Sequence, residues 1–113
     1  MNKEWILRFR VVDKDNFLEI KNGLKTVETR AATPKYREVK VGDMLVIVCG
    51  EERLEKKVKR VLTFTSIGSM VKRIPYKKIM PSVSSLSELR KIYYSYQGYK
   101  EKLKKHGVIA FNI

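Results

Sequence analysis

The chain has 113 residues, of which 43% are hydrophobic and 33% are charged, and its net charge is +13. This length fits a single domain over residues 1–113, and the composition is too apolar for a disordered chain and too charged for a membrane protein. With Cys49 and His106 as the only residues of their types, a disulfide, a metal site and a Ser-His-Asp triad are all disfavoured, so we expect no metal and no cofactor.

The first half of the chain predicts strands separated by one helix. Trp5, Leu7 and Phe9 alternate with Arg8 and Arg10, which is the period of a strand. We expect, in chain order, this strand up to residue 12, a helix that begins near Asp13 or Asp15 and stops at Gly23, a strand over 25–31, a loop over 34–41 and a buried strand over 44–49.

The second half predicts a long strand, several helices and a closing strand. A hairpin at 50–52 leads into a strand over 53–65, whose apolar phase slips near Arg60 and indicates a β-bulge there. Helices are expected over 66–74, after the capping box that begins at Ser85, and over 99–105, followed by a strand over 108–113 with two apolar faces. The order of elements predicts an α+β fold with a curved mixed sheet or small β-barrel and inserted helices.

Positive charge is concentrated in the second half. Residues 1–55 hold 11 basic and 10 acidic side chains, whereas residues 56–113 hold 14 basic side chains and two acidic ones. No acid occurs between Lys56 and Ser87, so these bases cannot be an ion-paired surface. A field of one sign attracts polyanions, and we expect nucleic acid as the partner rather than a membrane. The predicted basic surface consists of Lys56, Lys57, Lys59, Arg60, Lys72, Arg73, Lys77 and Lys78.

A polar row follows the first helix. On a strand, Thr26, Glu28 and Arg30 point to one face, and Lys25 stands at its start. The row is either a solvated outer face, where an exposed ion pair contributes little, or the wall of a polar cleft in which Arg30 binds a phosphate or orients Glu28. The residues alone leave both readings open.

The pattern Ile-x-x-Gly-x-Lys-Thr-x-Glu-x-Arg, followed by an aromatic loop and Val-Gly-Asp before an apolar strand, resembles the ASCH domain family. It comprises Ile20, Gly23, Lys25, Thr26, Glu28, Arg30, Tyr36, Val41, Gly42 and Asp43, and Gly107 to Phe111 is similar to the family's last strand. The resemblance implies a PUA-like β-barrel that binds RNA or other nucleic acid. It also implies a ligand cleft lined by Lys25, Thr26, Glu28, Arg30, Tyr36 and Arg37.

An enzyme is the alternative that this resemblance leaves open. Some ASCH proteins are amidohydrolases acting on acetylated cytidine, with a Lys base and a Thr nucleophile, and others are ribonucleases. Here Lys25 is in place, but Glu28 stands where that Thr would be, and a carboxylate is a poor substitute as acyl acceptor. If the chain is an enzyme, Lys25, Thr26 and Glu28 are the candidate catalytic residues.

The sequence therefore predicts an RNA-binding domain in preference to a hydrolase. Tyr93 and Tyr96 lie on a helical apolar stripe and are expected in the core, so Tyr94 is the better candidate for stacking on a base. No signal-peptide core follows residues 2–4, and we expect a cytoplasmic protein. The sequence does not fix the oligomeric state; we expect a monomer.

Overall fold

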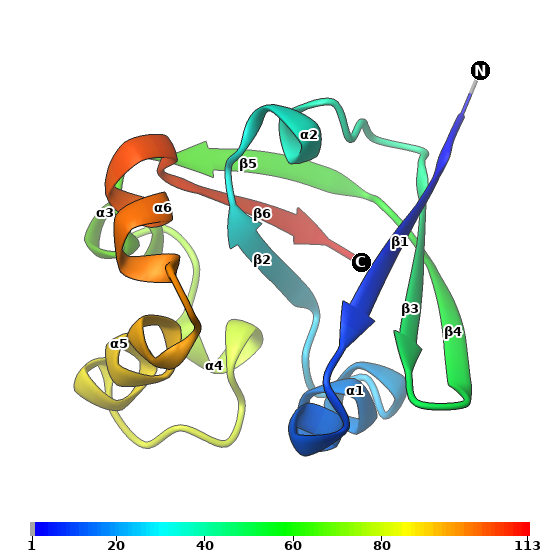
Figure 1. Cartoon of the computed structure of the whole chain (residues 1–113), viewed down its shortest axis with the longest axis horizontal. Helices are drawn as coiled ribbons and strands as arrows, with labels where there is room; N and C mark the ends of the chain where they lie inside the picture. The colour runs from blue at the N-terminus through cyan, green and yellow to red at the C-terminus, as the bar shows by residue number, and fades with distance from the viewer. Residues whose placement is uncertain (1) are drawn as a thin grey trace.

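Six strands and seven short helical segments make up the part of the chain that this computed structural model describes, residues 2–113 (Figure 1). The α+β class predicted from the sequence is confirmed. In chain order the elements are β1 (Glu4–Phe9), η1 (Val11–Asp13), α1 (Lys14–Lys21), β2 (Val27–Ala31), α2 (Pro34–Arg37), β3 (Met44–Cys49), β4 (Glu52–Lys57), β5 (Arg60–Phe64), α3 (Ile67–Val71), α4 (Tyr76–Ile79), α5 (Leu86–Ser95), α6 (Tyr99–His106) and β6 (Val108–Asn112).

The strands form two three-stranded sheets, in the orders β1-β3-β4 and β2-β6-β5. Strand β1 runs parallel to β3, and the other pairs are antiparallel. The expected barrel is therefore not closed, because β1 and β2 each remain an edge. Side chains meet across the gap instead of backbone groups: the guanidinium of Arg30 in β2 lies 5.4 Å from the ring centroid of Phe9 in β1.

The segment predicted as one bulged strand over 53–65 is two strands that belong to different sheets. β4 pairs with β3 and β5 pairs with β6, and the change occurs at Val58 and Lys59. There the Val58 N–H donates to the Asp43 carbonyl (2.8 Å) and the Lys59 N–H donates to the Asn112 carbonyl (2.8 Å). The slip in apolar phase near Arg60 is real, but a switch of sheet causes it rather than a bulge.

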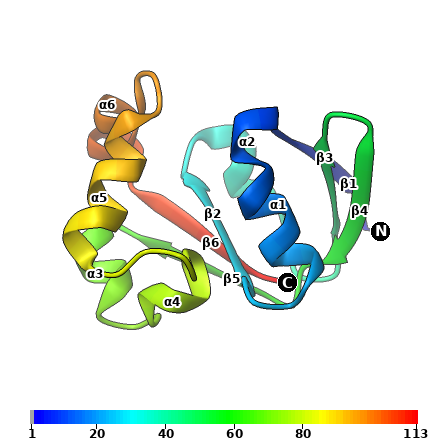
Figure 2. The same cartoon turned by 90° about the horizontal axis from the view of Figure 1, so that it is seen from below.

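Strand β6 separates two hydrophobic clusters, as its two apolar faces predicted. Val108 and Ala110 pack with helices α3 to α6, whereas Ile109, Phe111 and Ile113 pack with β1, β3 and α1. Figures 1 and 2 show β6 in the middle of the molecule, with α3 to α6 on one side and β1, β3 and β4 on the other. One short strand thus supports both halves of the core.

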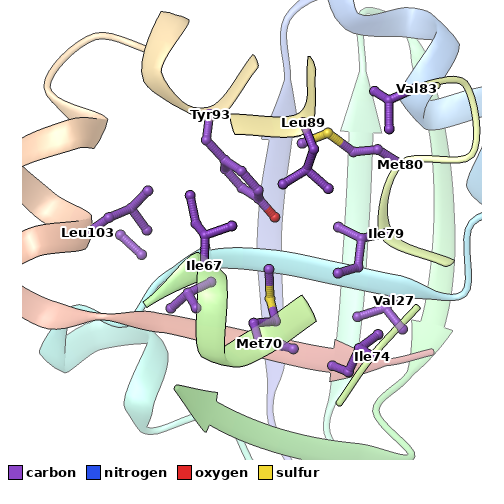
Figure 3. Close-up of a cluster of buried hydrophobic side chains, with 13 residues drawn as sticks. Val27, Ile67, Met70, Ile74, Ile79, Met80, Val83, Leu89, Tyr93 and Leu103 are labelled. Atoms are coloured by element: carbon purple, nitrogen blue, oxygen red, sulfur yellow. The ribbon is translucent and has the colours of Figure 1, made fainter. Parts of the chain in front are cut away.

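Four helices build the first of these clusters. Figure 3 shows Ile67 and Met70 of α3, Leu89 and Tyr93 of α5, and Leu103 of α6 pointing toward the sheet. The capping box expected at the start of α5 is half formed: the Ser85 side chain accepts from the Glu88 N–H, whereas the Glu88 carboxylate binds Ser84. Helices α2 and α4 were not predicted. No helix within residues 2–113 is long and apolar enough to cross a bilayer.

The end of α6 is set by a glycine in close contact with β5. Gly107 has φ +76°, a conformation that L side chains rarely adopt, and a Cβ atom there would lie 2.3 Å from the Phe64 carbonyl oxygen. The absence of a side chain therefore allows α6 to stop against β5 and the chain to turn directly into β6.

Candidate functional site

A cleft of about 350 Å³ lies between the edge strands β1 and β2 and is bordered by the α5–α6 connection. Its residues come from four parts of the sequence: the end of β1 with η1 and α1, the segment from Lys25 through β2, Met80, and the α5–α6 region. They are Arg8, Phe9, Arg10, Asp13, Asn16, Lys25, Glu28, Thr29, Arg30, Met80, Tyr93, Tyr96, Gln97, Tyr99 and Lys102.

Glu28 lies between two cations at the wall of the cleft. One carboxylate oxygen, Oε1, is 3.6 Å from the Lys25 Nζ and accepts a hydrogen bond from the Thr29 N–H at 2.8 Å. The other, Oε2, is 3.5 Å from an Nη atom of Arg30. Lys25 also donates to the carbonyl of Ile79, the last residue of α4. The row therefore has a fixed geometry that joins β2 to α4.

Lys25 and Glu28 of this row are buried and Arg30 is partly buried, so these charged side chains are not on a solvated outer face. Lys25 and Glu28 are each 5% exposed. Burial lowers the pKa of Lys25, because a desolvated ammonium is disfavoured, and the charge of Glu28 opposes that shift. The Oε2 atom of Glu28 is buried and has no hydrogen-bond partner within residues 2–113. Buried polar atoms without a partner are uncommon in folded proteins, so this carboxylate marks a candidate binding position.

Aromatic rings form the other walls. The Arg10 guanidinium lies 5.6 Å from the centroid of the Tyr96 ring, and Tyr96 and Tyr99 meet edge to face at 5.5 Å. The Tyr99 hydroxyl accepts from the N–H of Ala31 at 3.0 Å, which ties α6 to β2. Burial raises the pKa of Tyr96 to about 12 and also raises that of Tyr99. Both phenols are therefore neutral near pH 7 and can stack or donate.

The sequence profile of the ASCH domain matches residues 11–113. The chain belongs to the ASCH domain family. Two solved structures are similar over nearly the whole chain. The crystal structure of hypothetical protein PH0355 has a TM-score of 0.78 and 28% identity, and the match covers 99% of this chain and 96% of that one. The solution structure of protein PF0455 from Pyrococcus furiosus has a TM-score of 0.74 and 29% identity, covering 96% and 94%. No curated protein matches the chain.

Three of the six residues that the ASCH resemblance assigned to a cleft lie at this one, namely Lys25, Glu28 and Arg30. Thr26 is exposed and precedes β2, where its N–H donates to the Lys78 carbonyl and its carbonyl accepts from the Ile113 N–H. Tyr36 packs against the β1–β3 cluster from α2, and Arg37 points to the end of α6. The ASCH motif thus contributes Lys25, Glu28 and Arg30 to the cleft, whereas Thr26, Tyr36 and Arg37 make their contacts outside it.

The cleft also contains residues that sequence reasoning did not assign to it. Arg8 and Arg10 stood out as polar positions on the first strand, but nothing in the pattern indicated that they face β2. Tyr96 follows the apolar stripe of α5 and was expected in the core; it is partly buried against the helical cluster and also lines the cleft. Tyr94, the predicted stacking residue, is 44% exposed, lies outside the cleft and packs beside Lys100. A helical stripe alone does not separate core from cleft.

The basic segment consists of the eight bases from Lys56 to Lys78 named above, and three of them, Lys59, Arg60 and Lys78, lie at one end of the β2-β6-β5 sheet. The Lys59 N–H donates to the Asn112 carbonyl. The next residue, Ile113, donates its N–H to the Thr26 carbonyl, and the Thr26 N–H donates to the Lys78 carbonyl. Lys56 is partly exposed and the other seven bases are exposed. Within residues 2–113, none of the eight forms an ion pair with an acid. No three His, Cys, Asp or Glu side chains in this range could hold a metal ion.

Proposed function

We propose that this ASCH domain binds RNA, with one unpaired base or nucleotide in the cleft and neighbouring phosphates on the basic segment. The ASCH family is generally associated with RNA binding. Proteins read RNA sequence mainly from unpaired bases, which they stack on aromatic side chains and bind by hydrogen bonds at the base edges. The proposal therefore divides the task between one selective site and one surface of positive charge.

The buried carboxylate of Glu28 is the observation that carries this proposal. Its Oε2 atom lacks a hydrogen-bond partner within residues 2–113, although Arg30 lies 3.5 Å away. A carboxylate repels a phosphate but accepts a hydrogen bond from a base amino group, and the adjacent guanidinium can donate to ring or carbonyl acceptors of the same base. A volume of about 350 Å³ with Phe9 and Tyr96 in its walls is in the size range of small-molecule sites.

Binding assays of cleft variants test the selective site. Glu28→Gln and Arg30→Lys keep the approximate size of each side chain but remove the charge or the two-pronged donor. We expect each to reduce discrimination within a panel of RNAs by about 1–3 kcal/mol. The dependence of affinity on salt should change little, because the cleft reads the base rather than the backbone. Equal binding of every RNA by parent and variants would make this row a structural feature only.

The charged surface has a separate test. Lys72→Glu combined with Arg73→Glu should weaken all RNAs alike, since phosphate contacts carry no sequence information. For single strands the slope of log affinity against log salt decreases by about 0.7 for each phosphate that the protein no longer neutralises. Titrations of parent and variant at several salt concentrations measure this slope. An affinity that is the same at low and moderate salt in the parent would contradict the proposed surface.

A hydrolase is the second candidate, and the environment of Lys25 favours it. A lysine whose pKa is lowered by burial can act as a base, and it lies beside a carboxylate at the cleft. We nevertheless expect the purified protein to leave acetylated cytidine intact, because Glu28 stands at the position where those amidohydrolases have their Thr nucleophile. Chromatography of the reaction mixture decides the matter. Turnover that disappears in Lys25→Ala would establish the enzyme instead.

A further inference from the structure

A second hollow of about 360 Å³ lies at the opposite end of the β2-β6-β5 sheet from Lys59, Arg60 and Lys78 of the basic segment. We call it the α6 groove. It is formed where the ends of β5 and α6 meet α2, and it is lined by Arg37, Thr63, Phe64, Thr65, Lys104, Lys105, His106 and Gly107. Val108, which follows Gly107, pairs with Phe64 and Ala31 at this end of the sheet, whereas Asn112 pairs with Arg60 and Val27 at the other.

The α6 groove is lined by three cations, Arg37, Lys104 and Lys105, and by no acidic side chain among residues 2–113. Arg37, Lys104 and Lys105 are exposed, and no ion pair within residues 2–113 includes any of them. Thr63 and Thr65 add exposed hydroxyl groups that can donate hydrogen bonds. The partial negative charge at the C-terminal end of α6 opposes an anion here, but Arg37 donates to the carbonyl of His106 and offsets part of it.

Arg37 is held in place at the edge of the groove. Its Nε donates to the Ala32 carbonyl at 2.7 Å and one Nη donates to the His106 carbonyl at 2.8 Å. A guanidinium has five N–H donors, and these two bonds use only two of them. The remaining donors have a fixed direction, so binding of a phosphate would cost little side-chain conformational entropy.

Helix α6 connects this groove with the cleft. Tyr99 and Lys102 line the cleft, and Lys105 and His106 line the groove. Residues three apart on a helix are neighbours on its surface, so Lys102 and Lys105 are adjacent cations along one path. The eight residues of α6 span about 12 Å at 1.5 Å per residue. A stacked strand with the duplex spacing of roughly 3.4 Å per nucleotide would cover this length with about three or four nucleotides.

From these observations the geometry points to the α6 groove as a phosphate site for the RNA strand whose base occupies the cleft. This inference rests on the proposed RNA binding and adds the path of the strand: from the cleft, past Lys102, to Arg37, Lys104 and Lys105. The ligand class is the phosphodiester backbone of single-stranded RNA. The groove is distinct from the eight bases of the basic segment, of which Lys59, Arg60 and Lys78 lie at the other end of the sheet.

The test compares two double variants that remove the same charge. Lys104→Ala/Lys105→Ala changes the groove, and Lys40→Ala/Lys91→Ala changes two exposed lysines that line neither cavity. Each is titrated with nucleoside monophosphates and with single-stranded RNA of about six nucleotides, a length within the range of single-strand site sizes. The groove variant should bind the oligomer more weakly, with a salt slope shallower by about 1.4 if two phosphates are no longer neutralised. Binding of the monophosphate should be unchanged.

The outcomes separate this inference from the proposed function. If both double variants weaken the oligomer equally, only net charge matters and the groove is not a site. If Glu28→Gln alters selectivity while the groove variant binds as the parent does, the cleft function stands and the strand does not follow α6. If the parent binds no RNA, the proposed function fails and the groove inference fails with it. Binding of an acidic peptide in place of RNA, abolished in the groove variant, would assign the groove to a protein partner.

Discussion

The pair of Lys25 and Glu28 illustrates how single residues determine this cleft. Removing two charges from water is unfavourable, and their attraction compensates only when the remaining polar atoms also have partners. Lys25 reaches both Glu28 and the Ile79 carbonyl, while Glu28 reaches the Thr29 N–H and the Arg30 side chain. The arrangement is satisfied except at the Oε2 atom, which is buried, has no hydrogen-bond partner within residues 2–113 and has the Arg30 guanidinium 3.5 Å away.

Removal of one member of this pair should be costly. We expect Lys25→Ala to decrease the free energy of unfolding by about 3–5 kcal/mol, because it leaves Glu28 buried with less compensating charge. Lys21→Ala is the control: Lys21 is exposed, and its removal should cost no more than about 0.5 kcal/mol. Urea titrations of both variants measure the difference.

A double-mutant cycle with Lys25→Met and Glu28→Gln extends this test. The double variant should be less destabilised than the sum of the single variants, since it removes both charges together. Additive effects would show that the two side chains are not coupled.

Among the elements, the start of β1 depends on the turn that precedes β3. Asp43 is 4% exposed and accepts hydrogen bonds from the N–H groups of Lys3 and Lys40 and from the indole of Trp5, at 2.9 to 3.0 Å. The hydrogen bond from Lys40, then those from Lys3 and Trp5, hold the pKa of the Asp43 carboxyl below its ordinary value. The Val-Gly-Asp turn therefore fixes β1 beside β3 through one carboxylate.

This carboxylate should make stability depend on pH. Because the folded state lowers its pKa, the stabilisation is complete above the ordinary aspartate pKa of about 3.9 and is lost as the pH falls through the lower, folded value. Asp43→Asn should decrease the unfolding midpoint near neutral pH, and the gap to the parent should narrow in acid. The exposed Glu51→Gln is the control. A gap that stays constant with pH would contradict an ionised Asp43 in this role.

The two glycines that flank α6 should respond differently to an added side chain. Gly98 and Gly107 both have positive φ, at +72° and +76°, but a Cβ atom at Gly98 would meet nothing within 4 Å. Gly98→Ala should therefore cost about 1–2 kcal/mol, the penalty of a left-handed residue alone. Gly107→Ala should cost more, because its Cβ overlaps the Phe64 carbonyl. Thermal unfolding of the two variants compares them, and equal costs would mean that β5 moves away freely.

At the scale of the whole molecule, β6 joins the two hydrophobic clusters, so both should unfold together. Leu89 is 0% exposed in the helical cluster, and Trp5 packs against the other one. We expect Leu89→Ala to cost about 2–5 kcal/mol and to shift the unfolding curve of Trp5 fluorescence as far as that of far-ultraviolet circular dichroism. Trp5 is the only tryptophan, which makes the signal specific. Two separate transitions would show that the clusters are independent.

Much of the fold was accessible from the sequence because it depends on local periodicity. The alternation in Val108 to Ile113 predicted which side chains of β6 face each cluster, and the apolar run predicted β3 with its bounds. The helix that stops at Gly23 and the one that stops at Gly107 also follow from spacing and from glycine. These features are set by neighbours in the chain, which periodicity reports directly.

The tertiary structure alone decided which segments meet. Local pattern showed the slip near Arg60, but only hydrogen bonds from Val58 and Lys59 to distant strands made it a change of sheet. The motif named Lys25, Glu28 and Arg30, whereas pairing of β1 with β3 placed Phe9 and Arg10 opposite them, and α2 turned Arg37 toward α6. Strand pairing and packing between residues far apart in sequence produce no periodic pattern of side chains in the sequence. The cleft and the α6 groove therefore form only when the chain folds.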